Sequence, residues 1–190
     1  MKKTIAGVDE VGRGSLIGPV YAAAVILKKK LDKKKLKDSK KLSKKNREIL
    51  EKYIKKNSYW SIGSASLKEI EKMNILNASL LAMKRAIMKL KKKPGKILID
   101  GNKIPKIKNY NLKFVIKGDE KIPEISAASI IAKVSRDRLI TKMSKKYIKY
   151  SWNKNAGYGT KSHLLAIKKF GITKHHRKTF KPIHNILSLE

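Results

Sequence analysis

Two adjacent carboxylates, Asp9 and Glu10, lie inside an apolar stretch of a chain that has only 14 acidic residues against 48 basic ones. Water stabilises an ionised carboxylate strongly, so a carboxylate on a hydrophobic strand needs a compensating cation, and a divalent metal ion is the best one. The segment that follows, Gly12-Arg13-Gly14, combines a permissive backbone with a guanidinium. The pattern indicates a metal site beside a place where a polyanion could bind.

Two further segments deliver a carboxylate at or just after the end of an apolar strand. Asp100 follows Ile97-Leu98-Ile99, and Asp119 closes the segment that begins at Phe114. Such carboxylates suit Mg²⁺, which takes hard oxygen ligands, whereas the lack of cysteine and of any His-x-x-x-His pair argues against zinc. Because successive strand residues point to opposite faces, Asp9 and Glu10 can face one ion only where the strand ends or bulges; Gly12 favours such an irregularity.

The remaining acids leave the fourth ligand open. Asp100 and Asp119 each stand in a turn-like setting and could be simple turn residues. Asp137 lies near the buried stripe of a helix and therefore competes with Asp119, although flanking arginines offer it ion pairs. Spacing alone does not choose between them. The other glutamates considered are expected to be solvated: Glu48, Glu51, Glu69, Glu71, Glu120 and Glu124.

The composition predicts a single globular domain with a C-terminal appendage, because 190 residues with 41% apolar content can bury one good core. A formal net charge of +34 suggests a polyanionic partner, although lysine excess is often a property of solvated faces. Only six of the 48 basic residues are arginine, and these carry more weight as phosphate ligands. With no run of eighteen apolar residues and no signal-peptide pattern, we expect a soluble, cytoplasmic protein without membrane association.

The order of elements predicts an α/β fold whose sheet is partly antiparallel. The expected strands are 4–11, 19–27, 59–66, 96–100 and 112–116, the first two joined by the turn 12–18. The expected helices are 44–55 (capped by Ser43), a short one after the Ser66/Glu69 capping box, 77–90, 127–147 and 161–170. Residues 151–159 are expected to form a polar loop, and residues 175–182 a basic, irregular tail.

Taken together, several motifs make the chain resemble ribonuclease HII, the type 2 ribonuclease H family. The resemblance covers nearly the whole length, and the number and order of the motifs argue against coincidence. It implies an RNase H-like mixed five-stranded sheet flanked by helices, with a catalytic domain at 1–150 and a helical C-terminal extension at 151–190 that contributes to substrate binding. The motifs are 7–20, Asp38-Ser39-Lys40-Lys41-Leu42, 98–102, 117–119, 126–134, 157–160 and His176-Arg177-Lys178-Thr179-Phe180.

The resemblance also implies the site residues and the chemistry. The catalytic and metal-binding acids fall on Asp9, Glu10, Asp100 and Asp119, with Mg²⁺ or Mn²⁺ as cofactor in a two-metal mechanism and Asp137 as a supporting residue. The substrate-binding residues are expected at Gly12, Arg13, Gly14, Lys40, Lys41, Lys133 and Tyr158, and the three lysines could contact phosphates. Apart from the resemblance, His163 or His176 could also bind phosphate.

The implied activity is endonucleolytic cleavage of the RNA strand of RNA/DNA hybrids, and 5′ of single ribonucleotides embedded in duplex DNA, leaving 3′-hydroxyl and 5′-phosphate ends. We expect a monomer that removes ribonucleotides from DNA in repair and RNA primers in replication. One alternative is a ribonuclease HIII-like activity, which usually carries an extra N-terminal domain, whereas here the catalytic strand starts at Thr4. Another is a non-catalytic, basic nucleic-acid-binding protein of ribosomal type, which would leave the carboxylates on apolar strands unexplained.

Overall fold

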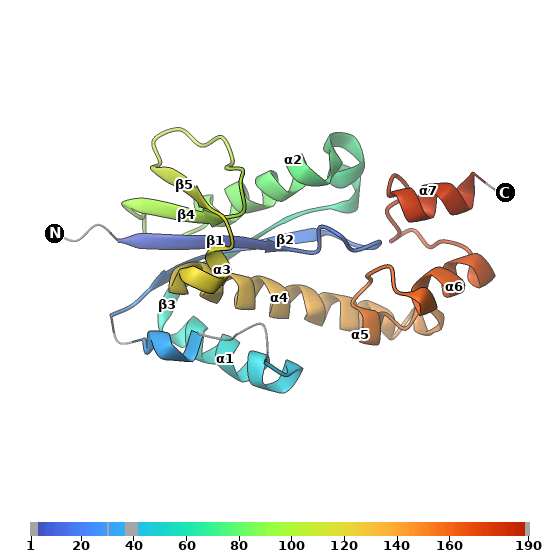
Figure 1. Ribbon diagram of the computed structural model, residues 1–190, viewed down its shortest axis with the longest axis horizontal. Coiled ribbons are helices and arrows are strands. Elements are labelled where there is room, and N and C mark those ends of the chain that lie inside the picture. The colour runs from blue at the N-terminus through green and yellow to red at the C-terminus, as the bar shows by residue number, and fades with distance from the viewer. Residues whose placement is uncertain (1–3, 30, 37–41, 189–190) are drawn as a thin grey trace.

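The computed structural model describes residues 4–29, 31–36 and 42–188, and a five-stranded sheet forms its centre (Figure 1). The strand order is β3-β2-β1-β4-β5. The strands are β1 (Ile5–Val11), β2 (Val20–Leu27), β3 (Ser58–Ala65), β4 (Lys96–Asp100) and β5 (Leu112–Val115). β1, β2 and β3 are antiparallel neighbours, whereas β4 and β5 run parallel to β1. The mixed five-stranded sheet predicted from the sequence is confirmed.

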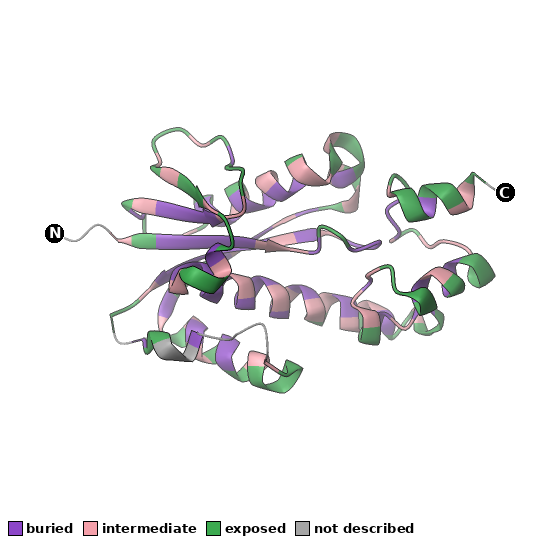
Figure 2. Cartoon of the chain, viewed as in Figure 1, coloured by how far each residue is buried: buried purple, intermediate pink, exposed green. Residues whose placement is uncertain are grey.

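Helices cover both faces of the sheet, so β1 and β2 are buried on both sides (Figures 1 and 2). One face packs against α2 (Leu67–Met88), which is kinked at Asn74, where φ is 67°. The other face packs against α4 (Pro123–Ser144), and α1 (Lys44–Lys56) packs on α4 and β3. Two short elements complete this part of the chain, η1 (Lys33–Leu36) and α3 (Gly118–Lys121).

Small residues let the helices approach the central strands closely. A Cβ atom added to Gly7 would lie 2.0 Å from the backbone carbon of Glu124 in α4. On the opposite face, a Cβ atom on Gly63 would lie 2.1 Å from the carbonyl oxygen of Ala82 in α2. Ala22, Ala23 and Ala24 are fully buried in β2. The spacing of both helix layers from the sheet therefore depends on residues with little or no side chain.

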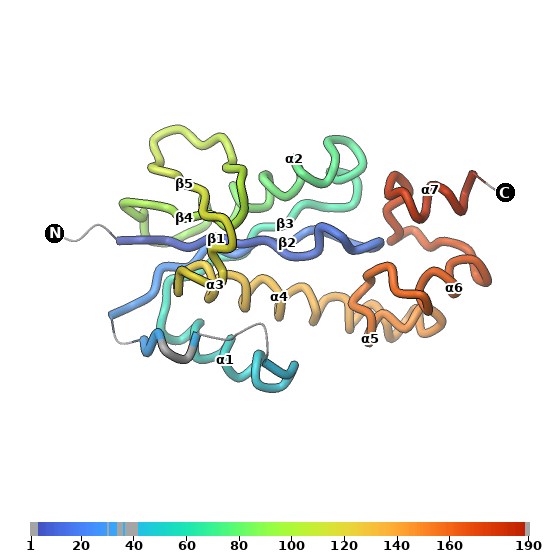
Figure 3. Tube along the Cα trace, viewed as in Figure 1, coloured from blue at the N-terminus to red at the C-terminus, as the bar shows by residue number. Residues whose placement is uncertain are grey.

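The C-terminal part of the chain forms a group of short helices at the far end of α4 (Figure 3). Their core joins Leu16 and Ile17 from the turn after β1 to Ile140 of α4 and Trp152, which is fully buried. The elements are η3 (Ile148–Tyr150), α5 (Trp152–Asn155), α6 (Lys161–Phe170) and α7 (Lys181–Leu187). Within the described part of the chain, no helix is long and apolar enough to cross a membrane.

Several local predictions are wrong in their details. The long helix begins at Pro123 rather than near residue 126, because proline occupies its first turn, where no N–H is needed. The expected polar loop contains α5 and the buried Trp152, and the expected irregular tail runs into α7. By contrast, the capping box of Ser66 and Glu69 is confirmed, and so is the break between a short and a longer helix, because Asn74 within α2 has a non-helical backbone with φ of 67° and ψ of 168°.

Two glutamates expected to be solvated are buried instead. The Glu51 side chain is 1% exposed and accepts hydrogen bonds from Arg138 at 3.0 and 3.1 Å, with Lys55 as a second cationic partner. Glu124 is buried at the start of α4 and pairs with Lys33 at 2.9 Å. Both glutamates lie where helices meet, and in each case an ion pair offsets the free-energy cost of removing the carboxylate from water.

We predict that Gly7→Ala destabilises the protein by roughly 3 kcal/mol or more, because the new methyl group meets helix backbone that cannot rotate away. Urea unfolding followed by circular dichroism measures the loss. Gly159→Ala is the control, since its Cβ would meet the flexible end of Leu16 at 3.3 Å and should cost less than about 1 kcal/mol. Equal losses in the two variants would contradict the close approach of α4 to β1.

Candidate active site

Asp9 is a buried carboxylate at the centre of the sheet. One of its oxygens accepts a hydrogen bond from the backbone N–H of Glu10 at 2.7 Å, and Ser129 of α4 donates another. Its charge interacts with Glu10 and Asp100. Three acids from two neighbouring strands therefore share one region, as the sequence predicted.

The strand register explains how they meet. β4 runs parallel to β1 with Val8 beside Ile99, so the next residues, Asp9 and Asp100, are neighbours on the face that packs against α4. The chain then leaves the sheet through Gly101, whose φ of +93° favours glycine. Glu10 belongs to the opposite face.

The expected bulge in β1 is not needed. β1 stays in regular antiparallel pairing with β2 as far as Val11, opposite Tyr21. Its paired register with β4 ends at Val8 opposite Ile99, which leaves the other edge of the strand open beside Glu10. Asp9 and Glu10 therefore reach one region from two faces, because the neighbouring strand stops rather than because β1 is irregular.

Asp119 comes to this region through α3. The backbone N–H of Gly118 donates to Asp100 Oδ1 at 2.7 Å, and Gly118 directly precedes Asp119. Lys117, with φ of 53°, makes the sharp turn from β5 into this helix. The competing acid, Asp137, pairs with Lys133 on α4 at 3.0 Å. The hydrogen bond from Gly118, the residue directly before Asp119, therefore holds the start of α3 next to Asp100.

Burial and mutual repulsion shift the acids toward the protonated form. Burial raises the pKa of Asp9 well above its ordinary value, and the negative charge of Glu10 raises it further. Burial also raises the pKa of Glu10, and the Arg13 guanidinium, 3.2 Å from Glu10 Oε1, partly offsets this. A bound cation would favour the ionised forms of both carboxylates.

The chemistry of these donors fits a divalent cation with hard-ligand preference. All are carboxylate oxygens, and their negative charges repel one another in a poorly solvated place. Across the described ranges, no three acidic or histidine side chains converge closely enough to form a ready-made ion cage. Mg²⁺ and its relatives do not need one, because they keep several water ligands and use few carboxylates.

The turn after β1 presents the Gly12-Arg13-Gly14 segment beside the acids. Arg13 and Gly14 are exposed, whereas Gly12 is buried with φ of +94°. A Cβ atom at Gly12 would lie 2.2 Å from Nε of Arg136, so no other residue fits there. The turn therefore exposes the backbone of Arg13 and Gly14 next to the carboxylates.

Tyr158 lies against this turn. Its backbone forms a β-bridge with Ser15, and Leu16 N–H donates to Gly157 O at 2.8 Å. The Tyr158 ring is half-buried, with Lys133 Nζ 5.7 Å from its centroid. The substrate-binding candidates Gly12, Arg13, Gly14, Lys133 and Tyr158 are thus brought together, whereas Lys40 and Lys41 lie outside the described residues.

The expectation that His163 or His176 contacts phosphate is wrong, because both are buried. Trp152 Nε1 donates to His163 Nε2 at 2.9 Å, which leaves His163 Nδ1 to donate to the Tyr158 carbonyl at 2.9 Å. His176 Nδ1 accepts from the backbone N–H of Thr173 at 2.8 Å, and its Nε2 lies 3.3 Å from His163 Nε2. Both imidazoles are neutral parts of a core that holds the Tyr158 backbone.

Comparison with known proteins decides the family. A model of the family Ribonuclease HII matches residues 6–183. The chain belongs to the ribonuclease HII family. A ribonuclease HII of Pelagibacter ubique (strain HTCC1062) is 73% identical over 185 residues, which are 97% of this chain and 100% of that protein. One from Neisseria meningitidis serogroup B (strain MC58) is 49% identical over 96% of this chain and 95% of its own.

The solved structures agree with this assignment. The ribonuclease H2 of Pyrococcus horikoshii OT3 matches with a TM-score of 0.81 and 30% identity, over 98% of each chain. This ribonuclease HII chain therefore has the RNase H fold and is a ribonuclease H enzyme. The alternative of a non-catalytic basic binding protein is excluded, and the family match selects ribonuclease HII over the HIII-like alternative.

We predict that Asp9→Asn raises the Tm of this ribonuclease HII by about 2–4 °C in buffer with EDTA at pH 7, the shift that roughly 1 kcal/mol gives in a domain of this size. The amide keeps the shape and the Ser129 contact but removes a charge that is costly to bury. Scanning calorimetry of Asp9→Asn and of the unchanged enzyme measures the difference in Tm. Asp137→Asn, which breaks an ion pair instead, should give no rise in Tm. Equal Tm changes in both variants would contradict the cost assigned to burying the Asp9 charge.

We predict a loss of stability of up to about 3 kcal/mol as the pH falls from about 6.5 to about 4, because burial lowers the pKa of His176 to about 4. In this window the unfolded chain binds a proton that the folded chain excludes. His176→Gln should therefore flatten the dependence of the unfolding free energy on pH, measured by urea unfolding. The exposed His184→Gln is the control; an unchanged slope in His176→Gln would refute the assignment.

Proposed function

We propose that the enzyme cuts the RNA strand of RNA/DNA hybrids, and cuts 5′ of single ribonucleotides in duplex DNA, to leave 3′-hydroxyl and 5′-phosphate ends. The observation that supports this most directly is the adjacency of two features on one strand and turn. The buried carboxylate Asp9 lies three residues before the buried Gly12, and the exposed backbone of Arg13 and Gly14 follows at once. Cleavage of the phosphodiester by the acids and recognition of the ribose by the turn can then involve neighbouring atoms of one nucleotide.

The acids Asp9, Glu10, Asp100 and Asp119 are the proposed ligands of Mg²⁺ or Mn²⁺. When bound, two such ions supply an activated water and stabilise the leaving 3′ oxygen. The protein holds the ligands in place beforehand: Ser129 and the Glu10 N–H fix the Asp9 carboxylate, and the Gly118 N–H fixes Asp100. Arg13 holds Glu10 from the turn side at 3.2 Å.

The exposed turn and the tyrosine beside it are proposed to detect the ribose 2′-hydroxyl. A Cβ atom on Gly14 would lie 3.9 Å from the ring of Tyr158, so ring and backbone border one small space. The 2′-hydroxyl both donates and accepts hydrogen bonds, and it is the group that distinguishes RNA from DNA at a given position. Backbone of Arg13 and Gly14 can bond to it, while the Tyr158 ring packs on the sugar.

Positive charge around this site is proposed to hold the duplex backbone. Lys133 projects from α4 beside Tyr158, and its ammonium also pairs with Asp137. Lys40 and Lys41 are proposed to add phosphate contacts, and the lysine-rich surface contributes binding without sequence preference. The C-terminal extension, 151–190, takes part through Tyr158, whereas 1–150 carries the acids.

This chemistry suits a monomeric cytoplasmic enzyme that removes ribonucleotides from DNA during repair and RNA primers during replication. A ribonucleotide in DNA differs from its neighbours by one oxygen atom. Detection through backbone groups therefore allows recognition in any base sequence.

The test is incubation with duplex DNA that contains one ribonucleotide, with Mg²⁺, with Mn²⁺ and with EDTA, followed by mapping of the cut. We expect cleavage on the 5′ side of the ribonucleotide only with metal. Asp119→Asn should lower kcat at least about 100-fold while the Kd for the duplex changes little, because the cationic surface remains. Asp137→Asn is the matched control on the competing acid; a larger loss from it, at equal folded stability, would refute the choice of Asp119.

A further inference from the structure

Two buried guanidinium groups hold the turn between β1 and β2. Arg177 is fully buried; its Nε donates to Gly18 O at 2.9 Å and its Nη1 to Arg13 O at 3.0 Å. Arg136 of α4 is fully buried as well, and donates to the carbonyls of Ile17 at 3.2 Å and Pro19 at 3.3 Å. The turn is therefore fixed by side chains from two distant parts of the chain.

These arginines contact no carboxylate in the described parts of the chain. Burial, together with the charge of Arg136, lowers the pKa of Arg177 to about 9. Its Nη2 is buried with no hydrogen-bond partner among the described residues, and the guanidinium lies 4.9 Å from the ring centroid of Phe180. A buried charge without a counter-ion is costly, so its retention calls for a reason beyond packing.

The bond to Arg13 O has a direct effect on the adjacent peptide. All peptide bonds in the described chain are trans, and in a trans peptide the C=O and the following N–H point in opposite directions. Because Arg177 draws the Arg13 carbonyl into the interior, the Gly14 N–H faces outward. Within the described residues this N–H has no hydrogen-bond partner, and Gly14 is exposed.

We propose that Arg177 is a positioning residue that determines specificity for ribose: by holding Arg13 O inside, it presents the Gly14 N–H to the substrate 2′-hydroxyl. This inference rests on the function proposed above. It assigns Arg177 no contact with substrate and no part in the chemical step. Arg136 holds Ile17 and Pro19, not Arg13, so it fixes the base of the turn rather than this peptide.

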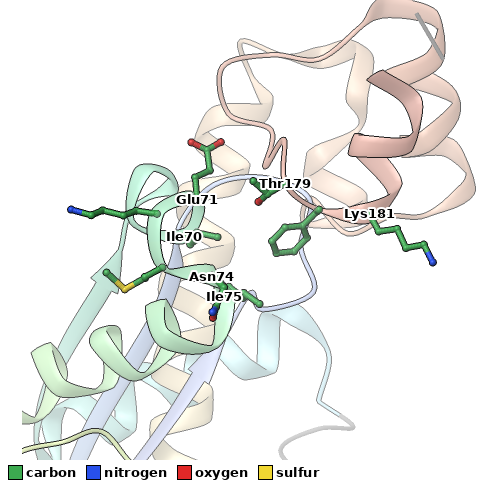
Figure 4. A pocket seen from close by; sticks show the side chains of 9 residues that line it. Ile70, Glu71, Asn74, Ile75, Thr179 and Lys181 are labelled. Carbon is green, nitrogen blue, oxygen red and sulfur yellow. The ribbon is translucent and has the colours of Figure 1, made fainter. Parts of the chain in front are cut away.

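Phe180 links this arrangement to a neighbouring cleft. Its ring packs on the Arg177 guanidinium, and it also lines a cleft between the kinked start of α2 and the start of α7 (Figure 4). The cleft is bordered by Ile70 and Asn74 on one side and Thr179 on the other. The aromatic ring shields Arg177 from this cleft, which keeps its two carbonyl bonds in a dry environment and so strengthens them.

The experiment measures ribose discrimination in Arg177→Met and Arg177→Lys. For each variant, kcat/KM is measured on duplex DNA with one ribonucleotide, and Kd is measured by fluorescence anisotropy in Ca²⁺ for that duplex and for its all-DNA counterpart. Arg177→Met should lower kcat/KM at least about tenfold and reduce the Kd ratio of the two duplexes toward one, with the Kd for all-DNA duplex changed less than about twofold. Arg177→Lys keeps one donor and should recover part of the ratio.

Arg138→Met is the matched control, because Arg138 pairs with Glu51 away from the turn. It should lower the Tm but leave the Kd ratio unchanged. The proposal is overturned if Arg177→Lys and any folded Arg177→Met keep the wild-type ratio, or if Arg138→Met reduces the ratio as much as they do. Failure of the proposed function is a different result: the wild-type enzyme itself would then not distinguish the two duplexes.

Discussion

The burial of the Asp9 carboxylate is the constraint on which the arrangement of the molecule depends. Asp9 is dry because α4 lies directly on β1, and α4 can lie there because position 7 has no side chain. The same close approach brings Ser129 within hydrogen-bonding reach of Asp9. The helix that builds the core, α4, thus also holds the buried Asp9 carboxylate in place. A change in core packing will therefore change the position and the burial of this carboxylate.

The basic residues of the chain divide into two groups with different uses. Lysine covers the surface, whereas most of the arginines are engaged within the protein. Arg85 and Arg138 hold glutamates, while Arg136 and Arg177 hold backbone carbonyls. Among the arginines, Arg13 lies in the exposed turn beside the acids. The greater weight given to arginine as a phosphate ligand was therefore wrong for most of them, because a planar fork also suits crowded carbonyl groups.

Local patterns in the sequence predicted what local physics decides. The strands carrying Asp9 and Asp100 were evident from apolar runs that end in an acid, and the partly antiparallel sheet followed from the hairpin-like start of the chain. Proline at residue 123 could have given the true start of α4. The roles of Trp152, His176 and Arg177 could not be read in this way. All three meet the turn after β1, far away in sequence: Trp152 packs in one core with Ile17, His176 forms a β-bridge with Ile17, and Arg177 donates to Arg13 O. A tail rich in basic residues has no local sign of burial.

The hydrogen bond from Arg177 to Arg13 O spans 164 positions of the chain. During synthesis the N-terminal strands leave the ribosome long before Arg177 exists, and domains fold as their residues become available. The sheet and the acids of β1 can therefore form while the turn still lacks its restraint. On the function proposed above, the acids are therefore in place before the restraint on the turn, and selectivity for ribose is the last property that the growing polypeptide acquires.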